Sequence, residues 1–310
     1  MNRNVSSHAT TVLYDQPPAD APQEQAPAPA RRGAVSRLVH RFSVLGLIGL
    51  ALVVFWLAVA FIGPLVAPYK GGAFTSTEIF ASYSAAHLLG TDYLGRDMLS
   101  RILYGTQHTV GLALASTVAA SVIGTCFGLI AAVSGRWVDE VLSRLFDALI
   151  SIPSKILALV VIAAFGSSIP MLMTVAALAY IPGAFRISRS LAVNIMTLEY
   201  VQVANARGEK LFYIARVEVL PNMIHPMLAD FGLRFVFIVL LLSGLSFLGL
   251  GVQPPNADWG SLVRENIGGL SEGAPAVLMP AVAIATLTVG VNLLIDSLRR
   301  HGARSHGGAK

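Results

Sequence analysis

Residues that could make or break bonds are few in this chain, and they are scattered along it. Cys126 is the only cysteine, and His108 stands alone in an apolar run. The sequence contains no P-loop, no H-E-x-x-H zinc motif and no G-x-S-x-G elbow, and the dipeptide Gly-Lys never occurs. We therefore expect no catalytic residues, no metal site and no cradle for ATP phosphates on this chain. Cys126 is predicted to be a small buried hydrophobe, and His108 a hydrogen-bonded interior residue rather than a ligand.

Charged residues crowd into one segment, YVQVANARGEKLFYIARVEVLPN, residues 200–222, which lies between long apolar runs. Small apolar residues recur there at three- and four-residue steps, which predicts one face of a helix: Val201, Ala204, Gly208, Leu211 and Ala215. Gly208 weakens a helix by about 1 kcal/mol relative to Ala, so we expect two short helices with a bend. Pro221 suits the first turn of the helix that follows. This small-faced segment could receive the surface of another protein, or it could rest on lipid headgroups.

The composition indicates the setting in which this segment lies. The chain of 310 residues is 55% hydrophobic and only 13% charged, with a mean hydropathy of +0.67, whereas a soluble domain has about 25% charged residues. Long uncharged windows of this kind predict an integral membrane protein. The net charge of +5 is spread over several short loops without a basic patch interleaved with aromatic residues, so nucleic acid is not an expected partner.

Six membrane-spanning helices fit the uncharged windows, so the predicted fold class is an all-α integral membrane protein. The expected spans are about 43–63, 106–134, 141–165, 171–192, 223–250 and 274–297. Residues 1–36 are rich in Pro and Ala and are predicted to be a disordered cytoplasmic tail, and residues 37–310 to be the membrane domain.

The distribution of Lys and Arg predicts how the helices are oriented. Cytoplasmic loops carry an excess of these residues. With the N-terminus inside, only four fall on the outer side: Lys70, Arg96, Arg101 and Arg264. We therefore expect both termini, and the charged segment 200–222, to lie in the cytoplasm.

Lys155 interrupts the third expected span, in the stretch SIPSKILAL. An ammonium group at membrane depth costs at least about 2.5 kcal/mol unless it faces water or a partner. Our hypothesis is that Lys155 faces the solute pathway and attracts a carboxylate of the substrate. Alternatively, it snorkels toward an interface or pairs with a carboxylate of a partner subunit. Asp230 and Arg234, spaced i,i+4, are expected to pair with each other.

The charged segment resembles the EAA loop of bacterial ABC-importer permeases, whose pattern is E-A-A, three residues, Gly, nine residues and I-x-L-P. Gly208 is followed after nine residues by EVLP, residues 218–221, so the spacing matches. Gln202, Val203 and Glu218 depart from the pattern. In that family the loop docks on a cytoplasmic ATPase. The resemblance assigns this role to Glu199, Gln202, Val203, Ala204, Arg207, Gly208, Leu220 and Pro221.

Two further segments resemble the dipeptide/oligopeptide/nickel branch of that family, C-type subunit. HLLGTDYLGRDMLSRILYG, residues 87–105, supplies an outer-face motif: Gly90, Thr91, Asp92, Gly95, Arg96 and Asp97. Thr91 or Asp92 is expected to cap a helix along the outer interface, with Asp97 spaced i,i+4 from Arg101. In LSFLGLGVQPPNADWG, residues 245–260, the paired prolines are expected to end the fifth span and Trp259 to anchor at the interface.

The resemblance implies a type I ABC-importer permease with a cytoplasmic coupling-helix loop, in a bacterial cytoplasmic membrane. It implies a second, B-type permease subunit, two ABC ATPase subunits and an extracytoplasmic substrate-binding protein. ATP and Mg²⁺ would bind to the ATPases, and this chain would bind no cofactor. The implied solutes are dipeptides or oligopeptides, with nickel chelates, glutathione or opine-like compounds as alternatives. A membrane-embedded hydrolase is a remote alternative. A secondary transporter is disfavoured because the sequence has no evident internal repeat and few carboxylates in its spans.

Overall fold

The computed structural model describes residues 43–307, with side chains as far as Leu298. The predicted tail, residues 1–36, lies outside the described residues. Helices dominate, and only isolated backbone bridges join Phe74 to Arg96 and Thr91 to Asp97. The elements are α2 (Val44–Val66), α3 (Met98–Val133), α4 (Arg136–Ile150), α5 (Ser154–Phe165), α6 (Ile169–Met196), α7 (Glu199–Ala206), α8 (Leu211–Tyr213), a π-helical turn (Ile214–Val219), α9 (Leu220–Phe247), α10 (Trp259–Asn266), a 3-10 turn (Ile267–Leu270) and α11 (Pro275–Gly307).

The described residues contain five single helices long and apolar enough to cross a membrane, or six spans if α4 and α5 together make one. The expected third span, 141–165, is not one straight helix, because α4 and α5 meet at an angle of 80°. Pro153 explains the break, since proline cannot donate a helical hydrogen bond and disfavours helical backbone in the residue before it. The all-helical membrane fold is confirmed, with this one correction.

Small residues let the long helices approach one another closely, as is common in membrane bundles. A side-chain carbon added to Gly124 of α3 would lie 2.4 Å from the Cβ of Ala184 on α6, and one added to Gly128 would lie 2.0 Å from the Oγ of Ser188. The Ser188 hydroxyl donates to the carbonyl of Gly124 at 3.1 Å. This contact and the close approach at Gly124 and Gly128 hold α6 against the second half of α3.

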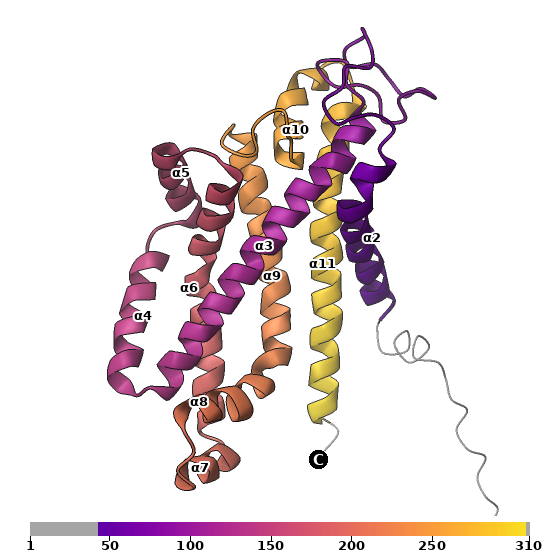
Figure 1. Ribbon diagram of the computed structural model, residues 1–310. Helices are drawn as coiled ribbons and strands as arrows, with labels where there is room; N and C mark the ends of the chain where they lie inside the picture. Colours follow the sequence, from indigo (N-terminus) through magenta and orange to yellow (C-terminus); the bar gives the residue numbers. More distant parts are fainter. Residues whose placement is uncertain (1–42, 308–310) are drawn as a thin grey trace, which may run out of the picture.

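The bundle has two distinct ends. Helices α7 and α8 lie at the end where α11 finishes, and α10 lies at the opposite end with the loop between α2 and α3 (Figure 1). Helix α3 has 36 residues and is therefore about 54 Å long, which exceeds the roughly 30 Å of a hydrocarbon core. The expected separate helix along the outer interface does not form, because residues from Met98 onward belong to α3 itself.

Candidate functional site

Residues 199–221 form two short helices with a bend, as the sequence predicts. Helix α7 ends at Ala206 and α8 begins at Leu211, and Gly208 between them has a φ of +77°. Side chains disfavour this left-handed backbone, whereas glycine adopts it readily. A Cβ on Gly208 would meet nothing within 4 Å. The backbone angle, and not a lack of space, therefore favours glycine here.

Beyond α8 the backbone widens into the π-helical turn Ile214–Val219 and continues as α9. Pro221 accounts for the wider turn, because its ring would clash with a carbonyl of the preceding α-helical turn. Pro221 lies in the first turn of α9, as expected, and Leu220 packs against a buried cluster. Helix α8, the turn and α9 thus form one helical stretch of 37 residues, Leu211–Phe247.

Two of the five residues of the small apolar stripe point into the protein, whereas Gly208 and Leu211 are exposed and Ala215 is half-buried. Val201 and Ala204 are completely buried. Val201 belongs to a cluster with Ala192, Ile214, Val219 and Met223, against which side chains from the ends of α3 and α6 pack. The expectation that the stripe receives another protein is therefore wrong for Val201 and Ala204. These residues anchor the segment to its own bundle.

Larger side chains occupy the outward side of the segment. We call this the α7–α8 surface, and its exposed members are Tyr200, Val203, Leu211, Phe212, Tyr213 and Val217. Phe212 is 74% exposed and Val203 is 56% exposed. Gln202, Arg207 and Lys210 are exposed beside them. Contiguous exposed apolar residues with a polar rim are typical of an interaction site.

Gln202, which departs from the family pattern, has a role within the chain. Its Nε2 donates to the carbonyl of Thr197 at 3.0 Å, which ties α7 to the C-terminal end of α6. A glutamate carboxylate could not donate this bond. Glu199 lies exposed in the first turn of α7, where a negative charge is favourable to the helix dipole.

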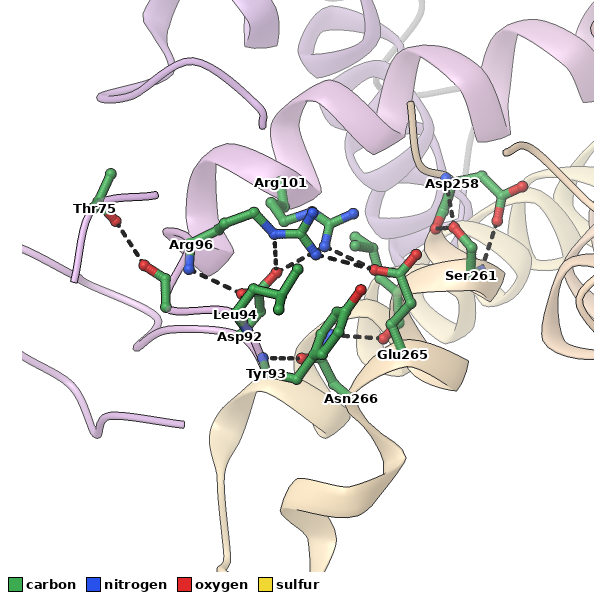
Figure 2. Close-up of polar contacts among 12 residues, drawn as sticks. Thr75, Asp92, Tyr93, Leu94, Arg96, Arg101, Asp258, Ser261, Glu265 and Asn266 are labelled. Carbon is green, nitrogen blue, oxygen red and sulfur yellow. Dashed lines mark hydrogen bonds and ion pairs between the residues drawn. The ribbon is translucent and has the colours of Figure 1, made fainter. Parts of the chain in front are cut away.

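At the opposite end of the bundle, four charged residues form what we call the outer ion cluster: Asp92, Arg96, Arg101 and Glu265 (Figure 2). The Asp92 carboxylate accepts from Arg96 Nε and from Arg101 Nη1, both at 2.7 Å. Glu265 of α10 accepts from the same two arginines at 3.3 and 2.8 Å. No member has a side chain more than 10% exposed. Two negative and two positive charges therefore balance one another inside the protein and join α3 to α10.

Backbone contacts extend this junction. Asp92 also accepts from the backbone N–H groups of Leu94 and Arg96 at 2.9 Å. The N–H of Tyr93 donates to the side-chain oxygen of Asn266 at 3.0 Å. Glu265 and Asn266 were missed from the sequence, because no local pattern connects them to a motif far earlier in the chain. A search for acidic partners of Arg96 and Arg101 beside the NADWG motif could have found Glu265.

Asp97, rather than Thr91 or Asp92, caps the helix of this motif. One Asp97 oxygen accepts from the N–H and the hydroxyl of Ser100, at 2.8 and 2.7 Å. The other lies 3.0 Å from Nδ1 of His87. Asp97 therefore fixes the start of α3. The ion pairs of Arg101 are with Asp92 and Glu265, so its sequence spacing from Asp97 did not predict its partners.

Gly90, Thr91 and Gly95 shape the loop that carries the cluster. The Thr91 hydroxyl accepts from the N–H of Ala81 and donates to the carbonyl of Glu78. Gly90 and Gly95 have φ angles of +74° and +71°. A Cβ on Gly95 would lie 2.2 Å from the carbonyl oxygen of Ser76, a separation that cannot be accommodated without moving the backbone.

We expect Gly95→Ala to lower the melting temperature of the purified protein clearly, since strained backbone and a steric clash together cost about 1–3 kcal/mol. Gly72→Ala is the matched control in the same loop, because a Cβ there meets nothing within 4 Å and its φ is not positive. Thermal unfolding in detergent measures both variants. Equal melting temperatures for the two would contradict the proposed constraint.

The fifth span ends earlier in the segment 245–260 than the sequence predicts. Helix α9 ends at Phe247, and Gly249 with a φ of +85° follows the helix end. Glycine at such a φ is a common helix terminator. The expectation that Pro254 and Pro255 end the fifth span is therefore wrong, since the prolines lie several residues further on.

The same segment closes over the first half of α3. Trp259 is completely buried, with its indole N–H donating to the carbonyl of Ile102 at 3.3 Å. Trp56 packs edge-on against it at 4.7 Å between ring centroids. Trp259 is therefore a core residue and not an anchor at the interface. Asp258 caps α10 and accepts from the hydroxyl of Ser246, and burial raises the pKa of its carboxyl.

The structure confirms some of the predictions for single residues in the spans and contradicts others. Asp230 and Arg234 form the expected ion pair. Lys155 is exposed, one residue into α5, directly after the break from α4. Cys126 is exposed on α3, so the prediction that it is buried is wrong. His108 is half-buried and lines a cavity of about 180 Å³ together with Arg101, Tyr104 and Asn256, among others.

Comparison with known proteins finds similarity to membrane subunits of transport systems in each case. Residues 124–304 match the protein family described as binding-protein-dependent transport system inner membrane component. A dipeptide transport system permease of Alkalihalophilus pseudofirmus is 30% identical over 95% of this chain and 96% of its own length. A glutathione transport system permease of Pectobacterium atrosepticum is 32% identical over 78% of this chain and 81% of its own. An inward-facing MetNI methionine ABC transporter chain shares the fold, with a TM-score of 0.54, 17% identity, and coverage of 66% of this chain and 95% of that chain.

Proposed function

The chain belongs to the family of binding-protein-dependent transport system inner membrane components, and from this premise we propose that its α7–α8 surface is the docking site of an ABC ATPase subunit. As an ABC-importer permease, it is a multi-pass membrane subunit and not an enzyme. In the proposed complex, two ATPases bind ATP and Mg²⁺, and this chain binds no cofactor. A second, B-type permease completes the pathway, and an extracytoplasmic binding protein delivers the solute.

The observation that carries the proposal is the division of residues 199–221 into two sides. The inner side is anchored by completely buried residues such as Val201 and Ile214. The outer side presents Tyr200, Val203 and Phe212 to solvent. A partner that closes against this side moves a segment that is already fixed to α3, α6 and α9. The docking then depends on the apolar shape of the surface, since Gln202 is hydrogen-bonded to its own chain.

This docking site places the α7–α8 end in the cytoplasm, because ATP is supplied there. The end of α11 lies on the same side (Figure 1), so the proposal puts the C-terminus of the chain in the cytoplasm, and the excess of Lys and Arg favours the same side for the N-terminus. The outer ion cluster then faces the side from which solute arrives. We propose dipeptides or short peptides as the solutes, because several relatives are named for such transport. Glutathione, itself a small peptide, is a variation on the same solute class.

Co-purification tests the assembly directly. We expect an affinity tag on this chain to retain a second permease and two ATPase subunits when the neighbouring transporter genes are co-expressed. Reconstituted into vesicles with the binding protein, the complex should accumulate peptide only when ATP is present on the α7–α8 side. Transport by this chain alone, or ATP dependence from the opposite side, would contradict the proposal.

Lys155 is proposed to attract the solute carboxylate at the break between α4 and α5. An exposed ion pair contributes about 0.2–1 kcal/mol. We therefore expect Lys155→Met to slow uptake of acidic peptides by up to about fivefold relative to neutral ones, with Lys155→Arg as the charge-retaining control. Snorkelling, or pairing with a partner subunit, predicts equal effects on both peptides. Competitive uptake of labelled acidic and neutral dipeptides measures the ratio.

A further inference from the structure

Helix α4 has three different faces. Leu142, Phe146 and Leu149 face the bundle and pack with side chains of α3 and α6. Of the two exposed faces, one is apolar: Trp137 (77% exposed), Val141 (47%) and Leu145 (55%). The other is charged, with side chains exposed by 60% at Glu140, 81% at Arg144 and 52% at Asp147. At 3.6 residues per turn the charged face covers about 60° of the helix, directly beside the apolar face.

The charged face extends onto α6. The Nη2 of Arg186 donates to the Asp147 carboxylate at 2.7 Å, and the Arg186 side chain is 56% exposed. Nearer the start of α4, Asp139 pairs with Arg189, and both are less exposed than the Arg186 pair. Arg144 lies 3.9 Å from Glu140 on α4 itself. The exposed charges are therefore paired, with two acidic and two basic side chains along one edge of α4 and α6.

These charges lie deep along the helix. Exposed tryptophan is typical of the boundary between membrane and water, so we take Trp137, exposed near the start of α4, as the marker of that boundary. Asp147 follows ten residues later, which is about 15 Å further along the helix. Half of a hydrocarbon core is also about 15 Å thick. Arg186 likewise lies ten residues before the end of α6, so this ruler places the Asp147–Arg186 pair within the inner half of the membrane, while half of each side chain is uncovered.

Lipid cannot cover this face at low energy. Each charged side chain at the centre of a membrane costs about 2.5–3.5 kcal/mol, and such residues face a water-filled cavity or another protein. The neighbouring Val141 and Leu145 have no such penalty in lipid. We propose that Glu140, Arg144, Asp147 and Arg186 line the water-filled route by which the solute crosses, and that the apolar face of α4 faces away from it. This inference rests on the proposed function, because it requires a transporter that opens and closes.

The balance of charge along this face indicates the chemical class of solute that it suits. Two carboxylates and two guanidinium groups have no net charge, so this face presents no electrostatic barrier to a positively or a negatively charged group of the solute. A solute with one ammonium and one carboxylate, such as a peptide with free ends, can exchange with either ion pair as it passes. The face is distinct from the outer ion cluster, whose four charges are buried.

Cysteine labelling tests the inference in the assembled transporter. Cys126 is first replaced by Ala, and Arg144→Cys or Asp147→Cys is introduced singly. Leu145→Cys and Val141→Cys are the controls on the apolar face, because their exposures of 55% and 47% match the 52% of Asp147. A charged thiosulfonate reagent reacts with the thiolate, which forms in water and not in lipid. In nanodiscs holding the complete complex, we expect the first two variants to react at least about tenfold faster than the controls, since burial in lipid raises a thiol pKa by more than one unit.

The effect of nucleotide on the labelling rate distinguishes a transport route from a surface that is always in contact with water. Trapping the ATPases with ATP and vanadate should change the labelling rate of Arg144→Cys severalfold, while the Leu145→Cys rate stays the same. Equal rates for the charged-face and apolar-face variants would overturn the inference, and so would a charged-face rate that ignores nucleotide. If the charged face reacts in the isolated chain and not in the complex, a partner covers it and the route lies elsewhere. Failure of the complex to assemble would instead contradict the proposed function.

Discussion

Phe212→Asp is expected to abolish retention of the ATPase subunits by the tagged permease. Phe212 is 74% exposed on the α7–α8 surface, so the substitution leaves the fold of the free chain intact. Aromatic residues at the centre of an interface commonly contribute 2 kcal/mol or more. Burying an unpaired carboxylate adds a further penalty. Affinity should therefore fall by at least about thirtyfold, and ATP-dependent uptake should fall with it.

Phe74→Asp is the control for this prediction. Phe74 is 73% exposed, so the same change is made at an equally exposed phenylalanine. It lies in the loop between α2 and α3, at the opposite end of the bundle (Figure 1). Quantitative co-purification should show a normal ATPase content for Phe74→Asp. A normal content for Phe212→Asp as well would show that the ATPases dock elsewhere.

Asp92→Asn should produce the largest loss of stability among single substitutions in the outer ion cluster. The amide can still accept from the N–H groups of Leu94 and Arg96, but Arg96 and Arg101 lose the carboxylate that neutralises them. Both arginines are at least nine-tenths buried and would keep only Glu265 as a counter-charge. Removing one partner of a buried ion pair costs about 3–5 kcal/mol. We expect a drop of several degrees or more in the melting temperature.

Glu272→Gln is the control, because it makes the same chemical change at an exposed residue on the same end of the bundle. Its melting temperature should match that of the unmodified protein. Glu265→Gln should fall between the two, since Asp92 would still contact both arginines. Thermal denaturation in detergent, followed by loss of the monodisperse peak, measures all three. A melting temperature for Asp92→Asn equal to that of Glu272→Gln would mean that the cluster contributes little to stability.

Uncharged windows of sufficient length predicted most of the spans, because hydropathy and length are properties of each segment alone. The predicted third span runs through Pro153, because the apolar window around this proline is long enough for one helix. Periodicity predicted that Val201 and Ala204 share a helical face. It could not predict that this face turns inward, since a small apolar stripe suits a bundle's own helices as well as a partner.

Contacts between residues far apart in the sequence were the main feature that sequence analysis missed. Arg101 has a carboxylate four residues before it in sequence, yet its partners are Asp92 and Glu265. Local spacing therefore suggested the wrong pair. Trp259 was assigned to the interface from its position after a span, whereas Trp56 and Ile102, on helices far away in sequence, enclose it. These contacts depend on how α2, α3 and α10 pack, which no single segment encodes.

The unbroken helical stretch Leu211–Phe247 has a mechanical consequence. It is 37 residues long, so its length along the helix is about 55 Å, with a bend where α8 passes into α9 (Figure 1). One tip carries Phe212, and near the other tip the hydroxyl of Ser246 is hydrogen-bonded to Asp258 at the head of α10. If an ATPase docks at Phe212 as we propose, force applied there reaches α10 through one continuous stretch of backbone. Under the same proposal, a change in α10 caused by solute binding would be transmitted along this stretch to the ATPase dock before ATP is hydrolysed.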